Sequence, residues 1–149
     1  MTSIYFARVG EYVKIGSASC VHKRMRTVLN GTRLICPDDL DRTLPIELLR
    51  LVPNCRRRDE LNMHLLFAAH WEVGEWFRWS PTFRFQMETM RFVTHAERLV
   101  LLRQARRSLG IVPGAPVKEW HWGQQVHEVL AEAKARRLST SRDDQRRAA

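Results

Sequence analysis

Two short runs of alternating apolar residues on either side of Gly10 constrain the fold more than any other feature of this sequence. The runs match a β-hairpin, because glycine readily adopts the positive φ that a tight turn between strands requires. With the turn at Gly10, the register places Tyr5 opposite Gly16. Neighbouring side chains of a strand point to opposite faces, so Tyr5 and Lys14 become diagonal neighbours on one face. The other face is apolar and consists of Ile4, Phe6, Val13 and Ile15.

The hairpin is followed by a pattern typical of a helix over residues 20–29. Ser17 and Ser19 are candidate N-caps for this helix, and Gly31 follows its expected end. Arg24 borders the apolar stripe of the helix, where a long side chain can reach past the packed edge. We therefore expect Arg24 to extend into a neighbouring site.

A second pair of polar residues shares one helical face further along the chain. The expected loop, strand and helix cover residues 32–43, 45–52 and 56–70, with Pro53-Asn54 ending the strand. In that helix, Glu60 and His64 are four residues apart and project together. The apolar stripe of the helix consists of Leu61, Leu65 and Ala68.

The C-terminal half is expected to be helical. Ser80-Pro81 provides an N-cap and a proline at the first helical position. Residues 82–109 contain no glycine or proline and predict one long helix or two. Residues 117–137 predict a last helix, and the polar segment 138–149 predicts a disordered tail.

The composition excludes several classes of protein. With 44% hydrophobic residues in 149, the chain can bury the core of one domain. Its longest apolar runs fall far short of the about 18 residues that a membrane span needs. No basic-then-apolar signal peptide opens the sequence, so we expect a cytoplasmic protein. The three cysteines are widely spaced, which favours free thiols over a disulfide framework or a zinc site.

The charge of the chain points to an anionic partner. Lysine and arginine outnumber aspartate and glutamate by 25 to 16, a formal net charge of +9, and only four of the cations are lysines. Arginine binds phosphate oxygens in pairs, so an arginine-rich domain favours nucleic acid as the partner. Charge alone leaves a second interpretation open, in which a GC-rich coding sequence produces a solvated arginine surface.

Five pieces of the first 80 residues form an ordered set: Ser3-Ile4-Tyr5, Val13-Lys14-Ile15-Gly16, Arg24, the helix with Glu60, and Gly74-Glu75-Trp76-Phe77. In this order and spacing they resemble the GIY-YIG nuclease family. Ser3-Ile4-Tyr5 matches the Gly-Ile-Tyr motif, and Val13-Lys14-Ile15-Gly16 matches the Tyr-Ile-Gly motif. Arg24 follows eight positions after that glycine, and Glu60 lies in a helix with a Glu-x-x-x-His pattern. Together with Gly74-Glu75-Trp76-Phe77, these pieces look most like a phage- and bacterial-type subgroup of the family.

The resemblance implies an α+β fold, with a small three-stranded antiparallel sheet flanked by helices. The helical pattern of the C-terminal half adds a helical extension. The nuclease-like domain would cover residues 1–95 and the extension residues 96–137. The resemblance also implies a divalent-metal-dependent endonuclease that hydrolyses DNA at a single-metal site.

Each expected site residue has a role that the resemblance supplies. Glu60 would hold Mg²⁺ or Mn²⁺, for which carboxylate oxygen is a suitable ligand. Arg24 would stabilise the phosphate as it gains charge. Tyr5 would orient or deprotonate the attacking water, and the charge of Lys14 would favour its phenolate. Secondary candidates are His64, Glu75 and Trp76, and the expected nucleic-acid contacts are Lys23, Arg26, Arg56, Arg57 and Arg58.

Two departures from the family pattern keep alternatives open. Lys14 replaces the tyrosine of the second motif, and Ser17 stands where subgroup members commonly carry another tyrosine. One alternative is a catalytically degenerate DNA-binding module on the same fold, which would not need Glu60. Another is an interaction protein whose C-terminal half pairs with a partner through Trp120, Trp122 and the apolar residues of segment 99–109.

Overall fold

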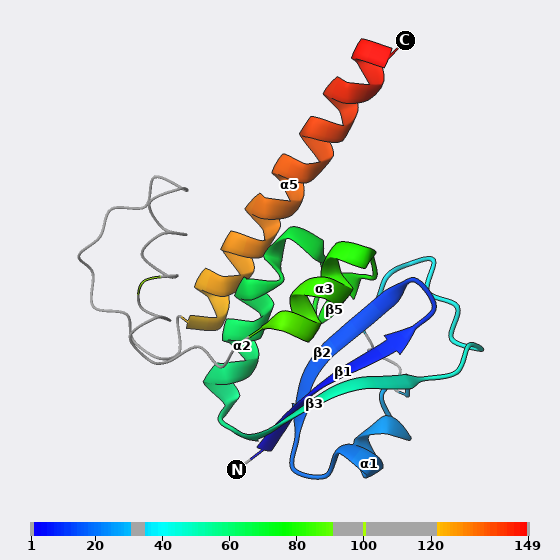
Figure 1. The fold of residues 1–149 in the computed structure, drawn as a ribbon, viewed down its shortest axis with the longest axis vertical. Coiled ribbons are helices and arrows are strands. Elements are labelled where there is room, and N and C mark those ends of the chain that lie inside the picture. Colours follow the sequence, from blue (N-terminus) through cyan, green and yellow to red (C-terminus); the bar gives the residue numbers. More distant parts are fainter. Residues whose placement is uncertain (1, 31–34, 91–99, 101–121, 149) are drawn as a thin grey trace.

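A computed structural model describes residues 2–30, 35–90, 100 and 122–148. Its centre is a five-stranded antiparallel sheet in the order β3-β1-β2-β5-β4 (Figure 1). The strands are β1 (Thr2–Val9), β2 (Tyr12–Ala18), β3 (Glu47–Cys55), β4 (Trp71–Val73) and β5 (Trp76–Arg78). The helices are α1 (Val21–Met25), α2 (Arg57–Leu66), the short 3₁₀ helix η1 (Ala68–His70), α3 (Pro81–Thr89) and α5 (Trp122–Ala148).

The predicted hairpin register is confirmed. Tyr5 pairs with Gly16, and Ala7 pairs with Lys14, with Gly10 at φ 57° in the turn. The apolar face packs into the main core against α2, α3 and α5, through residues such as Met63, Phe83 and Val126. The second face is buried as well, because α1 and the loop before β3 cover it.

The expected three-stranded sheet is wrong, because a second hairpin adds β4 and β5. Gly74, at φ 55°, lies in the turn between these strands, and β5 pairs with β2 through Trp76 opposite Lys14. Each strand has only three residues, which is too short for alternation to be recognised. The Gly-Glu-Trp-Phe segment is thus the turn and start of a strand that extends the sheet beside β2.

The predicted boundaries of α1 and β3 are also wrong. Because β2 continues to Ala18, the N-cap of α1 is Cys20 rather than Ser17 or Ser19. The helix ends at Met25 instead of residue 29, and the side chains of Thr27 and Asn30 bond to the backbone carbonyls of the preceding turn. Strand β3 continues through Pro53 to Cys55, since an edge strand tolerates a proline and the pairing with β1 shifts register there.

Helix α2 ends at Leu66, before the predicted residue 70, and η1 completes that stretch. The predicted stripe of Leu61, Leu65 and Ala68 is only partly buried. The more deeply buried residues are Asp59, Asn62, Met63, His64 and Phe67. The buried face of α2 contains polar residues, so its pattern of apolar residues is weak. The sequence therefore predicted the wrong face as the buried one.

Ser80 and Pro81 begin α3 as predicted, and the Ser80 hydroxyl accepts a hydrogen bond of 3.0 Å from the Phe83 amide. This helix ends at Thr89. Beyond Met90, the expected 82–109 helix lies outside the described residues except for Val100, as do Trp120 and the start of segment 117–137.

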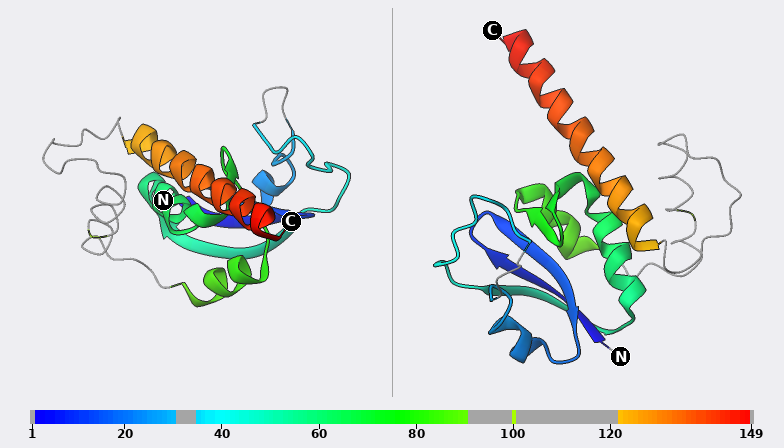
Figure 2. Two further views of the ribbon diagram at one scale, coloured as in Figure 1. Left: turned by 90° about the horizontal axis from the view of Figure 1, so that it is seen from above. Right: turned by 180° about the vertical axis from the view of Figure 1, so that it is seen from behind.

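Helix α5 corrects the prediction of a disordered tail, because it continues to Ala148. Segment 124–149 contains neither glycine nor proline, and an ion pair of 3.1 Å joins Arg136 to Glu132 one turn away. The helix crosses η1 and α2, and its C-terminal part projects from the body (Figures 1 and 2). No helix of the described residues is long and apolar enough to span a membrane.

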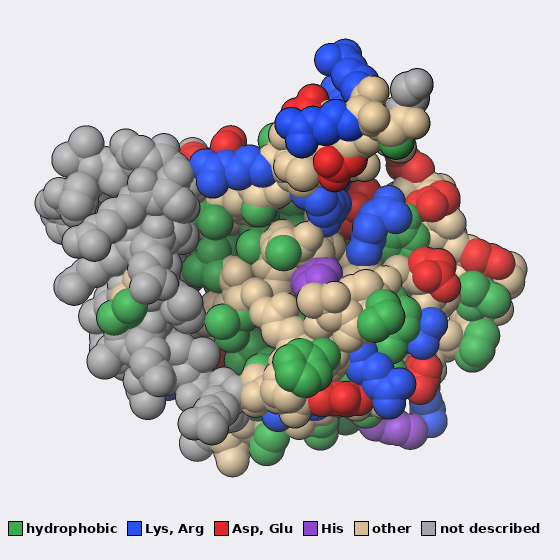
Figure 3. All heavy atoms as spheres, turned by 45° about the horizontal axis from the view of Figure 1, so that its top comes forward, with side chains coloured by type: hydrophobic (Ala, Val, Ile, Leu, Met, Phe, Trp, Pro, Cys, Tyr) green, Lys and Arg blue, Asp and Glu red, His purple; other side chains and the backbone are tan. Residues whose placement is uncertain are grey.

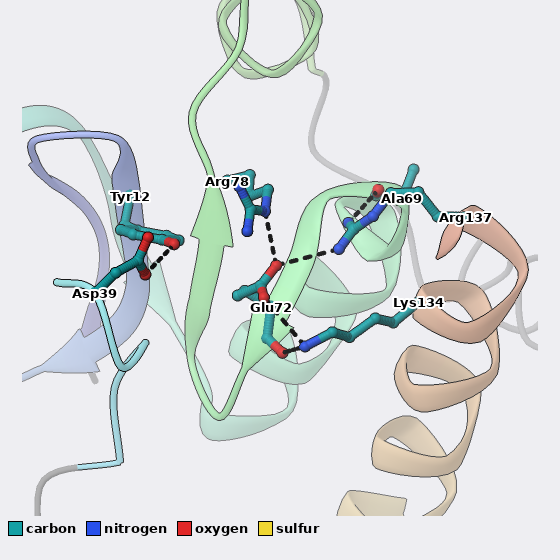
Figure 4. Close-up of polar contacts among 7 residues, drawn as sticks. All are labelled: Tyr12, Asp39, Ala69, Glu72, Arg78, Lys134 and Arg137. Atoms are coloured by element: carbon teal, nitrogen blue, oxygen red, sulfur yellow. Dashed lines mark hydrogen bonds and ion pairs between the residues drawn. The ribbon is translucent and has the colours of Figure 1, made fainter. Parts of the chain in front are cut away.

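Glu72 on β4 fastens α5 to the sheet (Figure 4). Its carboxylate accepts hydrogen bonds from Arg78, Lys134 and Arg137 at 2.8–3.2 Å. Arg137 also donates to the carbonyl of Ala69. Burial raises the pKa of Glu72, but the hydrogen bonds and charges of Arg78 and Lys134 outweigh it and leave the pKa below its ordinary value of 4.5.

We expect Glu72→Gln to lower the free energy of unfolding by about 1–3 kcal/mol, because three cations lose their shared anion. Since the folded pKa is depressed, this contribution is complete above pH 4.5 and is lost as the pH falls through the folded value. Urea unfolding at pH 7 and below pH 4 measures both effects. Glu88→Gln, in an exposed pair with Arg84, is the control and should cost less than about 0.5 kcal/mol. Equal costs for the two variants would contradict a fastening role for Glu72.

Candidate active site

Tyr5 is buried at the centre of the site, with 1% of its surface exposed. Its ring lies across the neighbouring strand, directly over Gly16. A Cβ at Gly16 would lie 2.5 Å from the Tyr5 hydroxyl oxygen and 2.7 Å from Cζ, so no other residue fits there without a shift. The hairpin register therefore creates the space that the phenol occupies.

Arg24 reaches the Tyr5 hydroxyl from α1, as its position beside the apolar stripe predicted. Its Nε donates a hydrogen bond of 3.3 Å to the hydroxyl oxygen. Val21 and Met25 of the same helix pack against the cluster that contains Tyr5, and this packing orients Arg24 towards the sheet. The guanidinium is thus held beside the phenol.

Several groups set the protonation of Tyr5. Burial raises the pKa of Tyr5, the hydrogen bond and positive charge of Arg24 lower it, and the charges of Glu75 and Glu60 raise it again. The net pKa lies above the ordinary value of 10, so the hydroxyl keeps its proton at neutral pH.

Glu60 reaches the site from α2, and two contacts with β2 hold that helix. The Ser17 hydroxyl donates a hydrogen bond to Glu60 Oε2. One turn later, Nε2 of the buried His64 donates to the carbonyl of Ile15 at 2.9 Å, and its ring lies 5.3 Å from that of Phe77. His64 therefore serves as a structural contact that positions α2, whereas Glu60 is half-buried and remains partly accessible.

Lys14 lies on the face predicted for it, but its ammonium contacts Glu75 rather than Tyr5. The Nζ–Oε2 distance to Glu75 is 3.0 Å, and Nζ lies 5.5 Å from the centre of the Trp76 ring. The Lys14 side chain is 5% exposed and that of Glu75 is 42% exposed. The cation in contact with the Tyr5 hydroxyl is Arg24.

The carboxylate of Glu60 fits a water-rich divalent cation. Among the described residues, no group of three or more His, Cys, Asp or Glu side chains is gathered in the manner of a metal cage. Magnesium is commonly held by only one or two carboxylates, together with waters and substrate phosphates. The donor set at Glu60 suits that mode of binding and does not suit a zinc or calcium site.

The expected nucleic-acid contacts are all exposed, and they lie close to Arg24 or Glu60 in the chain. Lys23 and Arg26 flank Arg24 on and just after α1, and the other three precede Glu60 at the start of α2, namely Arg56, Arg57 and Arg58. On α5 the cations are interleaved with acidic side chains, as the top of Figure 3 shows. Because they lie next to Arg24 and Glu60 in the chain, the cations on and beside α1 and α2 are better placed to contact a substrate at this site.

Ser17 is the site residue that sequence reasoning missed as a contributor. The sequence identified it as a candidate N-cap and as a departure from the family pattern, whereas the structure places its hydroxyl on the carboxylate of Glu60. The contact depends on how α2 lies against β2, and no local pattern encodes that placement.

No protein-family model matches this sequence, and comparisons with curated proteins and with solved structures also give no match.

Gly16→Ala tests the close approach of Tyr5 to β2. We expect it to lower the free energy of unfolding by about 1–3 kcal/mol, because the new Cβ overlaps the buried phenol. In a Tyr5→Phe background the hydroxyl is gone, so the same substitution should cost less. Thermal unfolding of the four proteins in this double-mutant cycle measures the difference. Equal costs in both backgrounds would show that the Tyr5 hydroxyl does not lie over Gly16.

Proposed function

We propose that this chain is a metal-dependent phosphodiesterase that hydrolyses DNA at the site of Tyr5, Arg24 and Glu60. The observation that carries the proposal is that residues from three separate segments meet at one part of β2. Arg24 of α1 contacts the hydroxyl of Tyr5 on β1, which lies over Gly16, and Glu60 of α2 bonds to Ser17, the next residue of β2. The sequence resemblance to GIY-YIG nucleases assigned catalytic roles to the same three residues.

The chemistry of these groups suits phosphodiester hydrolysis. A phosphate bound in the site gains negative charge as water attacks, and the guanidinium of Arg24 can pair with two of its oxygens. A divalent cation at Glu60, when bound, supplies further positive charge for the phosphate and the leaving oxygen. Tyr5 keeps its proton at neutral pH and acts first as a hydrogen-bonding group that orients the attacking water.

The surroundings of the site suit an extended polyanion. The five exposed cations on and directly beside α1 and α2 lie close to Arg24 and Glu60 in the chain. DNA presents phosphates along its length, so cations on both sides of the site would position a strand across it. These contacts would give affinity without sequence preference, because phosphates carry no base information.

Nicking of supercoiled DNA with Mg²⁺ or with EDTA tests the proposal. We expect Glu60→Gln to lower the Mg²⁺-dependent rate by at least about 100-fold, because the carboxylate that holds the cation is lost. Glu47→Gln, at an exposed glutamate of β3, is the matched control and should cleave at the wild-type rate. Circular dichroism verifies that both variants are folded.

Two outcomes would contradict the proposal. Full cleavage by Glu60→Gln would remove Glu60 as the metal ligand. DNA binding by a wild-type protein that never cleaves, with or without metal, would favour the non-catalytic DNA-binding module instead.

The salt dependence of binding tests the proposed contacts. If about five phosphates are neutralised, the logarithm of the binding constant for a short duplex should fall against log[salt] with a slope of about −4 to −5. Replacing both Lys23 and Arg26 by alanine should reduce the magnitude of that slope by about 2. Arg84→Ala, at an exposed cation of α3, should leave it unchanged. Fluorescence anisotropy measures all three proteins, and a flat salt response would exclude a phosphate footprint on α1 and α2.

A further inference from the structure

Lys14 and Glu75 form an ion pair beside the proposed catalytic tyrosine, in which the lysine is buried and the glutamate is partly exposed. The pair joins β2, which contains Lys14, to the turn between β4 and β5, which contains Glu75. The carbonyl of Glu75 also accepts a hydrogen bond of 3.0 Å from the amide of Ile15. The backbone thus fixes Glu75 next to β2, independently of its side chain.

The surroundings of Lys14 leave its ammonium little contact with water. Its side chain is 5% exposed, it pairs with Trp76 across the strands, and the Trp76 ring lies below the ammonium. A buried charge requires a partner, and here the partner is the carboxylate of Glu75. That carboxylate is 42% exposed and opens towards solvent from the rim of the site.

We propose that Glu75 is a positioning residue of this site, whose carboxylate neutralises the Lys14 ammonium and keeps it from the Tyr5 hydroxyl, so that Arg24 is the cation in contact with that hydroxyl. The inference rests on the proposed function only in treating Tyr5 as the group that acts on the attacking water. It explains how a lysine can stand diagonally beside Tyr5 without contacting its hydroxyl. The formal charges of the two side chains are opposite and equal.

We expect substitutions of the two partners to shift the pKa of Tyr5 in opposite directions. Glu75→Gln removes the anion and leaves the Lys14 charge near Tyr5, which favours the phenolate. Lys14→Met removes the cation and leaves the Glu75 charge unneutralised, which disfavours the phenolate. Arg24 and Glu60 also act on Tyr5, and both residues are unchanged in the two variants.

Phenolate absorbance measures this directly, because the chain contains only two tyrosines. The other tyrosine, Tyr12, has its pKa raised to about 12 by burial and by its hydrogen bond to Asp39, and Tyr12→Phe removes its signal. In that background, Glu75→Gln should shift the Tyr5 titration to lower pH and Lys14→Met should shift it to higher pH. Glu11→Gln, at the exposed hairpin turn, is the control and should cause no shift. Circular dichroism at each pH verifies that the proteins are folded.

The titration separates this proposal from a structural role of the pair. If loss of the pair merely loosened the fold, both variants would expose Tyr5 and shift its titration in the same direction, towards the ordinary value. A common direction, or no shift in Glu75→Gln, would overturn the proposal. Should Glu75→Gln fail to fold, Lys14→Met and the double variant decide. The double variant removes both charges, so its titration should lie below that of Lys14→Met, and coincidence of the two would overturn the proposal.

A cleavage assay distinguishes failure of the role proposed for Glu75 from failure of the proposed nuclease function. Where the wild type cleaves DNA, the pH of half-maximal rate should move to lower values in Glu75→Gln, together with the titration. If the wild type does not cleave and the titrations shift with opposite signs, the nuclease proposal fails and the role of Glu75 stands.

Discussion

The register of the β1–β2 hairpin is the constraint on which the rest of the site depends. Pairing Tyr5 with Gly16 sends Ile4, Phe6, Val13 and Ile15 into the main core and leaves Tyr5 and Lys14 on the other face. A slip of one residue would exchange the two faces. It would also place a side chain other than glycine beneath the phenol, where there is no room for a Cβ. Fold and candidate site are therefore specified by the same pairing.

Three helices pack against the hairpin, and two of them bring polar groups to the site. Helix α1 covers the face of Tyr5 and brings Arg24 to its hydroxyl, while α2 packs on the opposite face and brings Glu60 to Ser17 at the end of β2. Helix α5 contributes Val126 and Leu130 to the main core. The expected division between residues 1–95 and a C-terminal extension thus does not separate two cores, since both parts contribute side chains to one.

The sequence predicted those features that depend on neighbouring residues. The hairpin, the Ser80 cap and the position of Arg24 follow from alternation, capping chemistry and helical spacing, and all three are confirmed. The features that it missed depend on contacts between distant segments. β5 is held by its pairing with β2, the contact of Ser17 with Glu60 depends on how α2 docks, and the ion pair of Lys14 requires the turn at Glu75.

The most direct test of this account is the position of a divalent cation. A crystal of the protein grown with Mn²⁺, and examined by anomalous diffraction, should show one strong peak at the carboxylate of Glu60, beside Arg24 and Tyr5. The same crystals of Glu60→Gln should lack the peak. A peak elsewhere, or none at Glu60 at millimolar Mn²⁺, would contradict a single-metal site built on the hairpin.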